Sequence, residues 1–275
     1  MLSGTRANET LVLPVRALSG RQGRLHRVAT DLLFLVDAYL REFDATVVAV
    51  ADDGSVALDR TAFYATGGGQ PHDTGVLRWD GGEAAVVDVG KDGDVAWHHL
   101  EGDGRAEGAN VHGEIDWERR HALMRTHTAL HVMGGVIWNE WRVPATGGNM
   151  EPLAARMDFE LGTLPEGFAA RLEDAVNAEL VADRAIQVAY VPRSVLDEED
   201  LIRTKVNMVP EHVTEVRLVD IVGLDKQADG GTHVRSTAEV GRVRILKTES
   251  KGKGNKRVRL AVEDVEAIED VEASA

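Results

Sequence analysis

The chain of 275 residues contains no cysteine. This absence excludes disulfide bonds, a thiol nucleophile and any thiolate ligand for a metal. It favours a reducing compartment, so we expect a cytoplasmic protein. Long apolar segments are missing too: none approaches the roughly 20 residues that a helix needs to span a bilayer. The longest apolar run near the start, residues 32–36, is enclosed by Asp31 and Asp37. We therefore expect no membrane partner.

Positive charge is scarce as well. The chain has 31 Lys and Arg residues against 46 Asp and Glu, a formal net charge of −15. Such an acidic chain repels phosphate at long range, which argues against indiscriminate binding of nucleic acid. We expect no DNA partner, although a local basic patch is compatible with this total.

The two ends of the chain differ in composition from the rest. The first 30 residues carry five arginines and one acidic residue, which is typical of a transit peptide. A second interpretation is that translation starts at Val28. We expect residues 1–30 to be disordered or to lie outside the native protein. Residues 263–275 hold six acids and no base, and we expect them to form an acidic tail.

The pattern between residues 45 and 115 predicts short strands joined by tight turns. Asp-Gly pairs such as Asp80-Gly81 and Asp92-Gly93 punctuate the segment, as is typical of hairpins. The predicted strands are 46–50, 56–58, 76–79, 84–89, 95–100 and 109–115. This spacing predicts a small antiparallel β-barrel or sandwich over residues 31–115.

A helical period begins after Asp116, which is a plausible N-cap. Apolar residues recur at helical spacing from Trp117 to Trp141, and a second helix is predicted across Pro165 to Asp183. Strands are predicted at 186–191, 213–219, 242–247 and 257–262. The sequence therefore predicts a β-barrel followed by an α+β domain at 116–262, an α+β fold overall.

Two short segments carry the residue types of a metal site. His127 and His131 are four residues apart, which places both imidazoles on one face of a helix. In the second segment, Asp229 and His233 flank two glycines that let the backbone fold tightly. Three nitrogens and one oxygen are a sufficient set for tetrahedral Zn²⁺. The alternative is a pair of partly exposed helix histidines without a metal.

Two further segments are candidates for binding. Residues 65–75 contain three successive glycines followed by Gln70, a composition that indicates a bulge, a ligand close to the backbone or a surface loop. Residues 242–259 hold eight basic residues and one acid. Glycines make residues 251–257 a flexible loop suited to phosphates, or else a solvated hairpin tip.

These motifs together resemble a known family. The order Gly-Gly-Gly-Gln-Pro-x-Asp-x-Gly at 67–75, Arg-Arg-x-x-x-Met-Arg-x-His-Thr-x-x-His at 119–131 and Gly-Gly-Thr-His-Val at 230–234 resembles the AlaX group of free-standing alanyl-tRNA editing proteins. These are related to the editing domain of alanyl-tRNA synthetase. The resemblance runs from about Phe34 to Val262 and includes Ser-Lys-Gly-Lys-Gly-Asn-Lys-Arg at 250–257. The glycine-rich motif within a β-domain is similar to the medium-length members.

The resemblance implies one Zn²⁺ bound by His127, His131 and His233, with Asp229 where many members have cysteine. Aspartate would bind the metal directly, bind it through water, or leave a three-histidine site with an open position. The implied activity is trans-editing: hydrolysis of the ester that joins serine, or glycine, to alanine tRNA. The partner is thus mischarged alanine tRNA. A bound Zn²⁺ would activate a water or position the ester, and the sequence leaves both open.

Roles for other residues follow from this chemistry. Gln70, reaching in from the β-domain, is expected to contact the amino acid or the terminal adenosine. Thr128 and Thr232 are candidates for recognising the serine hydroxyl, while Asp225 and Gln227 are candidates for bonding the imidazole N–H groups. The predicted contacts to tRNA are Arg119, Arg120, Arg125, Lys251, Lys253, Lys256 and Arg257.

Two other classes of protein compete with an editing enzyme. One is a zinc hydrolase of small esters or amides, although the His pair lacks the glutamate of His-Glu-x-x-His peptidases. The other is a non-catalytic RNA-binding module with a structural zinc, because closed four-ligand sites are usually structural.

Overall fold

The computed structural model describes residues 29–102, 106–198, 200–207, 209–252 and 254–264. The predicted leader, residues 1–30, and the predicted tail, residues 263–275, therefore lie almost wholly outside the described residues. Lys253, a predicted tRNA contact, also lies outside them. Within the described part of the chain, no helix is both long and apolar enough to cross a membrane.

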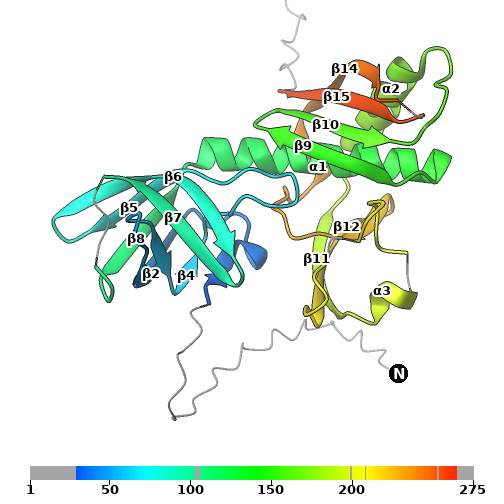
Figure 1. Cartoon of the computed structure of the whole chain (residues 1–275). Helices are drawn as coiled ribbons and strands as arrows, with labels where there is room; N and C mark the ends of the chain where they lie inside the picture. The colour runs from blue at the N-terminus through cyan, green and yellow to red at the C-terminus, as the bar shows by residue number, and fades with distance from the viewer. Residues whose placement is uncertain (1–28, 103–105, 199, 208, 253, 265–275) are drawn as a thin grey trace, which may run out of the picture.

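The first half of the chain forms a closed six-stranded barrel, which confirms the barrel predicted from the short strands (Figure 1). Neighbouring strands are antiparallel, in the order β2-β3-β7-β6-β5-β8. Gly81 and Gly93 adopt positive φ angles of 84° and 59° in two of the predicted Asp-Gly turns, a backbone conformation that favours glycine. The bounds are β2 Glu42–Val50, β3 Val56–Leu58, β5 Gly75–Trp79, β6 Gly82–Asp92, β7 Val95–Glu101 and β8 Asn110–Ile115.

Helix α1 (Trp117–Trp141) leaves the barrel directly after β8. The carboxylate of Asp116 accepts a hydrogen bond from the Arg119 amide at 3.1 Å, so the predicted N-cap is confirmed. At 1.5 Å per residue the helix is about 38 Å long. It runs from the barrel to the second half of the molecule, so one rigid element connects the two parts (Figure 1).

The second half is built on two antiparallel sheets. The larger has the strand order β14-β15-β10-β9, and helices α1 and α2 pack against it. The smaller has the order β11-β12-β13. The bounds are β9 Ala145–Glu151, β10 Ala154–Phe159, α2 Phe168–Val181, β11 Ile186–Pro192, β12 Glu215–Ile221, β13 Asp225–Ala228, β14 Arg242–Ser250 and β15 Lys256–Glu263. Short elements complete the fold: β1 Asp31–Leu32 paired with β4 Arg60–Thr61, η1 Leu33–Leu35, α3 Val195–Glu198 and η2 Thr237–Val240.

A buried ion pair joins the barrel side of the molecule to α1. The side chains of Arg120 and Asp73 are both fully inaccessible to solvent. Arg120 Nε lies 3.0 and 2.9 Å from the two carboxylate oxygens of Asp73, and its terminal nitrogens donate to the carbonyls of Ala38 and Ala62. Asp73 also accepts from the Tyr64 amide at 2.6 Å. The glycine-rich hairpin, between Tyr64 and Asp73, is thereby held against α1.

Candidate functional site

The two predicted metal-binding segments meet in the structure. His127 and His131 lie one turn apart on α1, and Asp229 and His233 lie on the loop that follows β13. One nitrogen of each histidine and one oxygen of Asp229 all lie within 4.8 Å of one another. The three histidines are 4–7% exposed. Over the described residues, this is the one group of histidine and carboxylate side chains arranged to hold a metal ion.

The spacing of these donor atoms fits a tetrahedral cation. The Nε2 atoms of His127 and His131 lie 3.6 and 3.7 Å from Asp229 Oδ1, and His233 Nε2 lies 3.1 Å from Oδ2. Zinc–nitrogen bonds of about 2.0–2.1 Å at tetrahedral angles would place neighbouring donors about 3.3 Å apart. The four side chains could therefore hold a metal ion with small adjustments.

Gln70 orients one of the imidazoles. Its Oε1 lies 3.0 Å from His127 Nδ1 and also accepts from the Thr232 amide at 3.1 Å, while its Nε2 donates to Thr232 Oγ1 at 2.9 Å. If the His127 Nδ1–H donates to Oε1, the Nε2 lone pair faces Asp229. Gln70 does reach in from the barrel side, as predicted. It is only 1% exposed, however, with both ends of its amide bonded to protein.

Thr128 plays a similar part for His233. The Thr128 hydroxyl lies 3.1 Å from His233 Nδ1 and accepts from the Val234 amide at 3.4 Å. Thr128 and Thr232 are both inaccessible to solvent. Both hydroxyls, the predicted candidates for serine recognition, therefore bond groups of the site itself.

Asp229 is held by its own loop and by β12. Its Oδ2 accepts from the Gly231 amide at 2.6 Å, and Arg217 Nη1 donates to the Asp229 carbonyl at 2.9 Å and lies 3.7 Å from Oδ2. A cation would have to compete with these partners for Oδ2, whereas Oδ1 faces His127 and His131. Arg217 is missing from the sequence prediction. Its position in β12, opposite Tyr190 of β11, gives no local signal of the site.

Burial keeps the imidazoles neutral. It lowers the pKa of His127 and His131 to about 3 and that of His233 to about 4. Burial also opposes ionisation of Asp229, but neighbouring His127 and the hydrogen bond with His233 hold the pKa of its carboxyl well below the ordinary value. At neutral pH the cluster therefore offers unprotonated donors, the form that binds a cation.

Asp225 lies elsewhere. Its carboxylate accepts from Arg203 Nε at 2.7 Å and Gln227 Nε2 at 2.9 Å, so both residues predicted to bond the imidazoles bond each other instead. Burial raises the pKa of Asp225. Asp225 contacts α1 at Gly135, one turn beyond His131, because a Cβ on Gly135 would lie 2.9 Å from Asp225 Cβ. Gln70 and Thr128, and not Asp225 and Gln227, lie within hydrogen-bonding distance of the imidazole Nδ1 atoms.

The three arginines of α1 bond protein groups. Arg120 is fully buried, so it reaches no phosphate and its prediction as a tRNA contact is wrong. Arg119 Nε donates to the His72 carbonyl at 3.1 Å. Arg125 donates to the carbonyls of Val240 and Glu263 and pairs with Asp264, and its side chain is 11% exposed.

The basic segment of β14 and β15 is partly neutralised within the protein. Arg257 forms a two-bond ion pair with Asp158, at 2.7 and 2.8 Å. Lys251 is exposed at the turn, and Lys256 Nζ lies 3.5 Å from Ser250 Oγ. Counting charges along the sequence therefore overstates the cations available at this hairpin.

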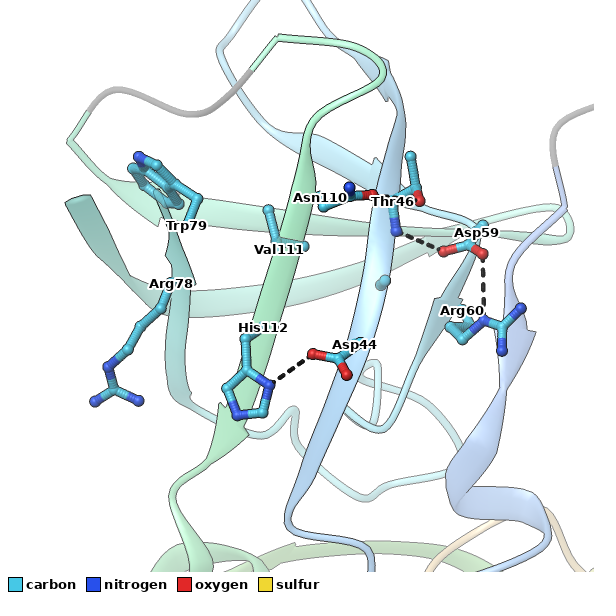
Figure 2. A pocket seen from close by; sticks show the side chains of 10 residues that line it. Asp44, Thr46, Asp59, Arg60, Arg78, Trp79, Asn110, Val111 and His112 are labelled. Carbon is cyan, nitrogen blue, oxygen red and sulfur yellow. Dashed lines mark hydrogen bonds and ion pairs between the residues drawn. The ribbon is translucent and has the colours of Figure 1, made fainter. Parts of the chain in front are cut away.

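A hollow on the surface of the barrel is lined by none of the four cluster residues (Figure 2). None of the predicted site residues lines it. Its polar groups bond one another: His112 Nδ1 lies 2.8 Å from Asp44 Oδ1, and Asp59 accepts from the Thr46 amide at 2.8 Å and from Arg60 Nε at 3.2 Å. The candidate site is therefore the histidine cluster.

Comparison with known proteins gives the class. Residues 27–119 match the family described as tRNA synthetases class II (A), and residues 216–259 match the threonyl and alanyl tRNA synthetase second additional domain. The second match contains Asp229 and His233. Both families describe parts of aminoacyl-tRNA synthetases, so these two segments of the chain are similar to parts of those enzymes.

Individual relatives narrow the class. The chain is 39% identical to the alanyl-tRNA editing protein AlaX-M of Methanosarcina acetivorans over 244 residues, 86% of this chain and the whole relative. It is 36% identical to AlaX-M of Saccharolobus solfataricus, over 85% of this chain and 99% of the relative. The chain belongs to the AlaX-M family of alanyl-tRNA editing proteins. It is also 40% identical to the alanine–tRNA ligase of Pyrobaculum neutrophilum, of which the match spans 25%.

Proposed function

We propose that the protein is a trans-editing deacylase, which hydrolyses the ester joining serine or glycine to the 3′ end of alanine tRNA in the cytoplasm. The observation that carries the proposal is the convergence of three buried imidazole nitrogens on the Asp229 carboxylate, beside the glycine-rich hairpin. We further propose residues 31–115 as its β-barrel domain and residues 116–262 as its α+β editing domain.

We propose that one Zn²⁺ is held by His127, His131 and His233, with Asp229 as the fourth and weakest ligand. When bound, it supplies Lewis acidity toward the ester carbonyl or the attacking water. Gln70 and Thr128 hold the imidazoles through their Nδ1 atoms and are positioning residues. Burial of the cluster keeps its nitrogens unprotonated at neutral pH. The ester bond is cleaved by water, giving free amino acid and a tRNA with its 3′ hydroxyl restored.

A closed four-ligand set is the observation that favours the alternative, an RNA-binding module with a structural zinc. Deacylation of serine-charged, glycine-charged and alanine-charged alanine tRNA separates the two. We expect release of serine or glycine but not alanine, loss of activity after chelation, and recovery when Zn²⁺ is added. Metal-loaded protein that binds tRNA yet releases no amino acid would support the structural alternative and end the proposal.

Gly231 provides a test of the packed geometry. A Cβ at Gly231 would clash with the Cε1 and Nδ1 atoms of His127 and lie 2.8 Å from Gln70 Oε1. We expect Gly231→Ala to displace the imidazole and weaken zinc binding by about 10- to 100-fold, the cost typical of disturbing groups that support a metal ligand. Zinc affinity is measured by competition with a chromogenic chelator. The matched control is Gly230→Ala, where a Cβ would meet nothing within 4 Å. Equal affinity in both variants would contradict the geometry.

A further inference from the structure

The outer face of the β14-β15-β10-β9 sheet carries a set of cations. Helices α1 and α2 pack on the inner face, where alternate residues such as Met150, Val258 and Leu260 are buried. The residues between them point to the opposite face. We define the cationic face by six basic side chains: Arg156, Arg242, Arg244, Lys247, Arg257 and Arg259. Four carboxylates lie on the same face: Glu151, Asp158, Glu249 and Glu263. Arg244 lies 4.0 Å from Glu263 and 3.5 Å from Glu173 of α2. The face therefore keeps more basic than acidic side chains in a protein of net charge −15.

Strand register aligns part of this face into a row. Asn149 of β9 is paired with Arg156 of β10, Arg156 with Arg259 of β15, and Arg259 with Lys247 of β14. Neighbouring strands lie about 4.8 Å apart, so the row crosses about 14 Å of the sheet. The side chains of Arg156, Arg259 and Lys247 are 30%, 43% and 64% exposed.

Two carboxylates hold the cations without covering them. Glu249 lies 2.8 Å from Lys247 Nζ and 3.0 Å from Arg259 Nε. Asp158 bonds Arg257 twice and lies 3.4 Å from Arg156 Nη1. Each carboxylate therefore serves two cations, which fixes long side chains while an excess of positive charge faces solvent.

The row begins beside the candidate site. At β9, the Met150 amide donates to the Gly69 carbonyl at 3.2 Å, and a Cβ on Gly69 would lie 3.3 Å from the Gly148 carbonyl oxygen. The next residue along the hairpin, Gln70, bonds His127. Asn149, at the end of the row, is therefore the direct neighbour of Met150, whose backbone contacts the glycine-rich hairpin.

We propose that the cationic face binds the phosphate backbone of the tRNA acceptor stem, whose single-stranded 3′ end enters the histidine cluster. This inference rests on the proposed function. A line of guanidinium and ammonium groups is complementary to regularly spaced phosphates and reads no base sequence. The arginines of α1 bond protein groups instead, whereas this face presents several exposed cations together.

The double variant Arg156→Ala/Lys247→Ala tests the proposal. Asp158 then keeps Arg257 and Glu249 keeps Arg259, so neither carboxylate loses its last partner. We expect uncharged alanine tRNA to bind about 10-fold more weakly in filter binding at low salt. The slope of log affinity against log salt should fall by nearly two, about one for each phosphate contact. The matched control, Lys91→Ala/Arg171→Ala, removes the same two residue types from the barrel and from α2, and should bind within about twofold of the unmodified chain.

Glu249→Gln should have the opposite effect, because it removes a negative charge from the face. We expect several-fold tighter binding and an unchanged or steeper salt slope. The proposal is overturned if the double variant and Glu249→Gln both bind tRNA as the unmodified chain does. Hydrolysis of seryl-adenosine, which has no stem, by the unmodified chain reports on the proposed function separately. If the chain does not hydrolyse seryl-adenosine, the proposed deacylase activity is contradicted. The tRNA-binding measurements then still test the cationic face.

Discussion

Alanine in place of His131 is expected to reduce deacylation of serine-charged alanine tRNA by about 10³-fold or more. The expected loss exceeds the 10- to 100-fold typical of residues that only support a ligand, because this change removes a donor nitrogen itself. His131 Nε2 is 3.7 Å from Asp229 Oδ1 and is buried, so no neighbouring water or side chain replaces it readily. The measurements are single-turnover deacylation rate and zinc content of the purified protein.

His112→Ala is the matched control for this experiment. His112 lies on the barrel surface, where its ring contacts Asp44 and Glu42, and it should keep the full rate and zinc content. An unchanged rate in His131→Ala would contradict the assignment of the cluster as the active site. Lost zinc with an unchanged rate would mean that the metal is structural.

The second large effect concerns stability. Arg120→Met is expected to lower the free energy of unfolding by about 3–5 kcal/mol, because it leaves the Asp73 carboxylate buried without its cation. The double variant Arg120→Met/Asp73→Asn should be less destabilised than Arg120→Met, since it removes the uncompensated charge. Urea unfolding followed by circular dichroism gives these free energies.

Arg171→Ala is the comparison for Arg120→Met. Its partner is Glu140, and both side chains are about half exposed. Exposed pairs contribute about 0–1 kcal/mol, so this variant should unfold almost like the unmodified chain. Equal effects of the Arg171 and Arg120 changes would show that the buried pair does not hold the hairpin on α1.

Local pattern predicts much of the fold. The Asp-Gly turns, the barrel strands and the N-cap at Asp116 all depend on residues close together in sequence, and the structure confirms them. Strands β9, β10 and β13 are not predicted. The segment Ala145–Glu151 contains two glycines and no run of β-branched residues, so its strand conformation comes from pairing with β10.

Site residues that are close together in the sequence are predicted, whereas partners that are far apart in the sequence are not. The spacing of His127 and His131, and of Asp229 and His233, is local and is visible in the sequence. The partners of their rings are not: Gln70 is 57 residues from His127, and Thr128 is 105 residues from His233. Proximity in sequence favours Asp225 for this part, but β13 directs its carboxylate to Arg203.

Arg120 carries two sequence signals that point in opposite directions. It lies three residues before Leu123, four before Met124 and seven before His127, in the stripe of α1 that faces the interior. A cation in such a stripe indicates a buried partner. Its place within a motif rich in arginine favours an RNA contact instead, and no local pattern identifies Asp73, 47 residues away, as the partner.

The long reach of Gln70 has a consequence for biosynthesis. Its amide bonds Thr232, 162 residues downstream, so the barrel strands and α1 leave the ribosome well before the loop that completes the centre. Domains fold in the order of synthesis, N-terminal parts first. A nascent chain should therefore present its hairpin and first two histidines early, and complete the histidine cluster only when translation nears its end. Premature termination before Asp229 would release a chain that lacks two of the four side chains of the cluster.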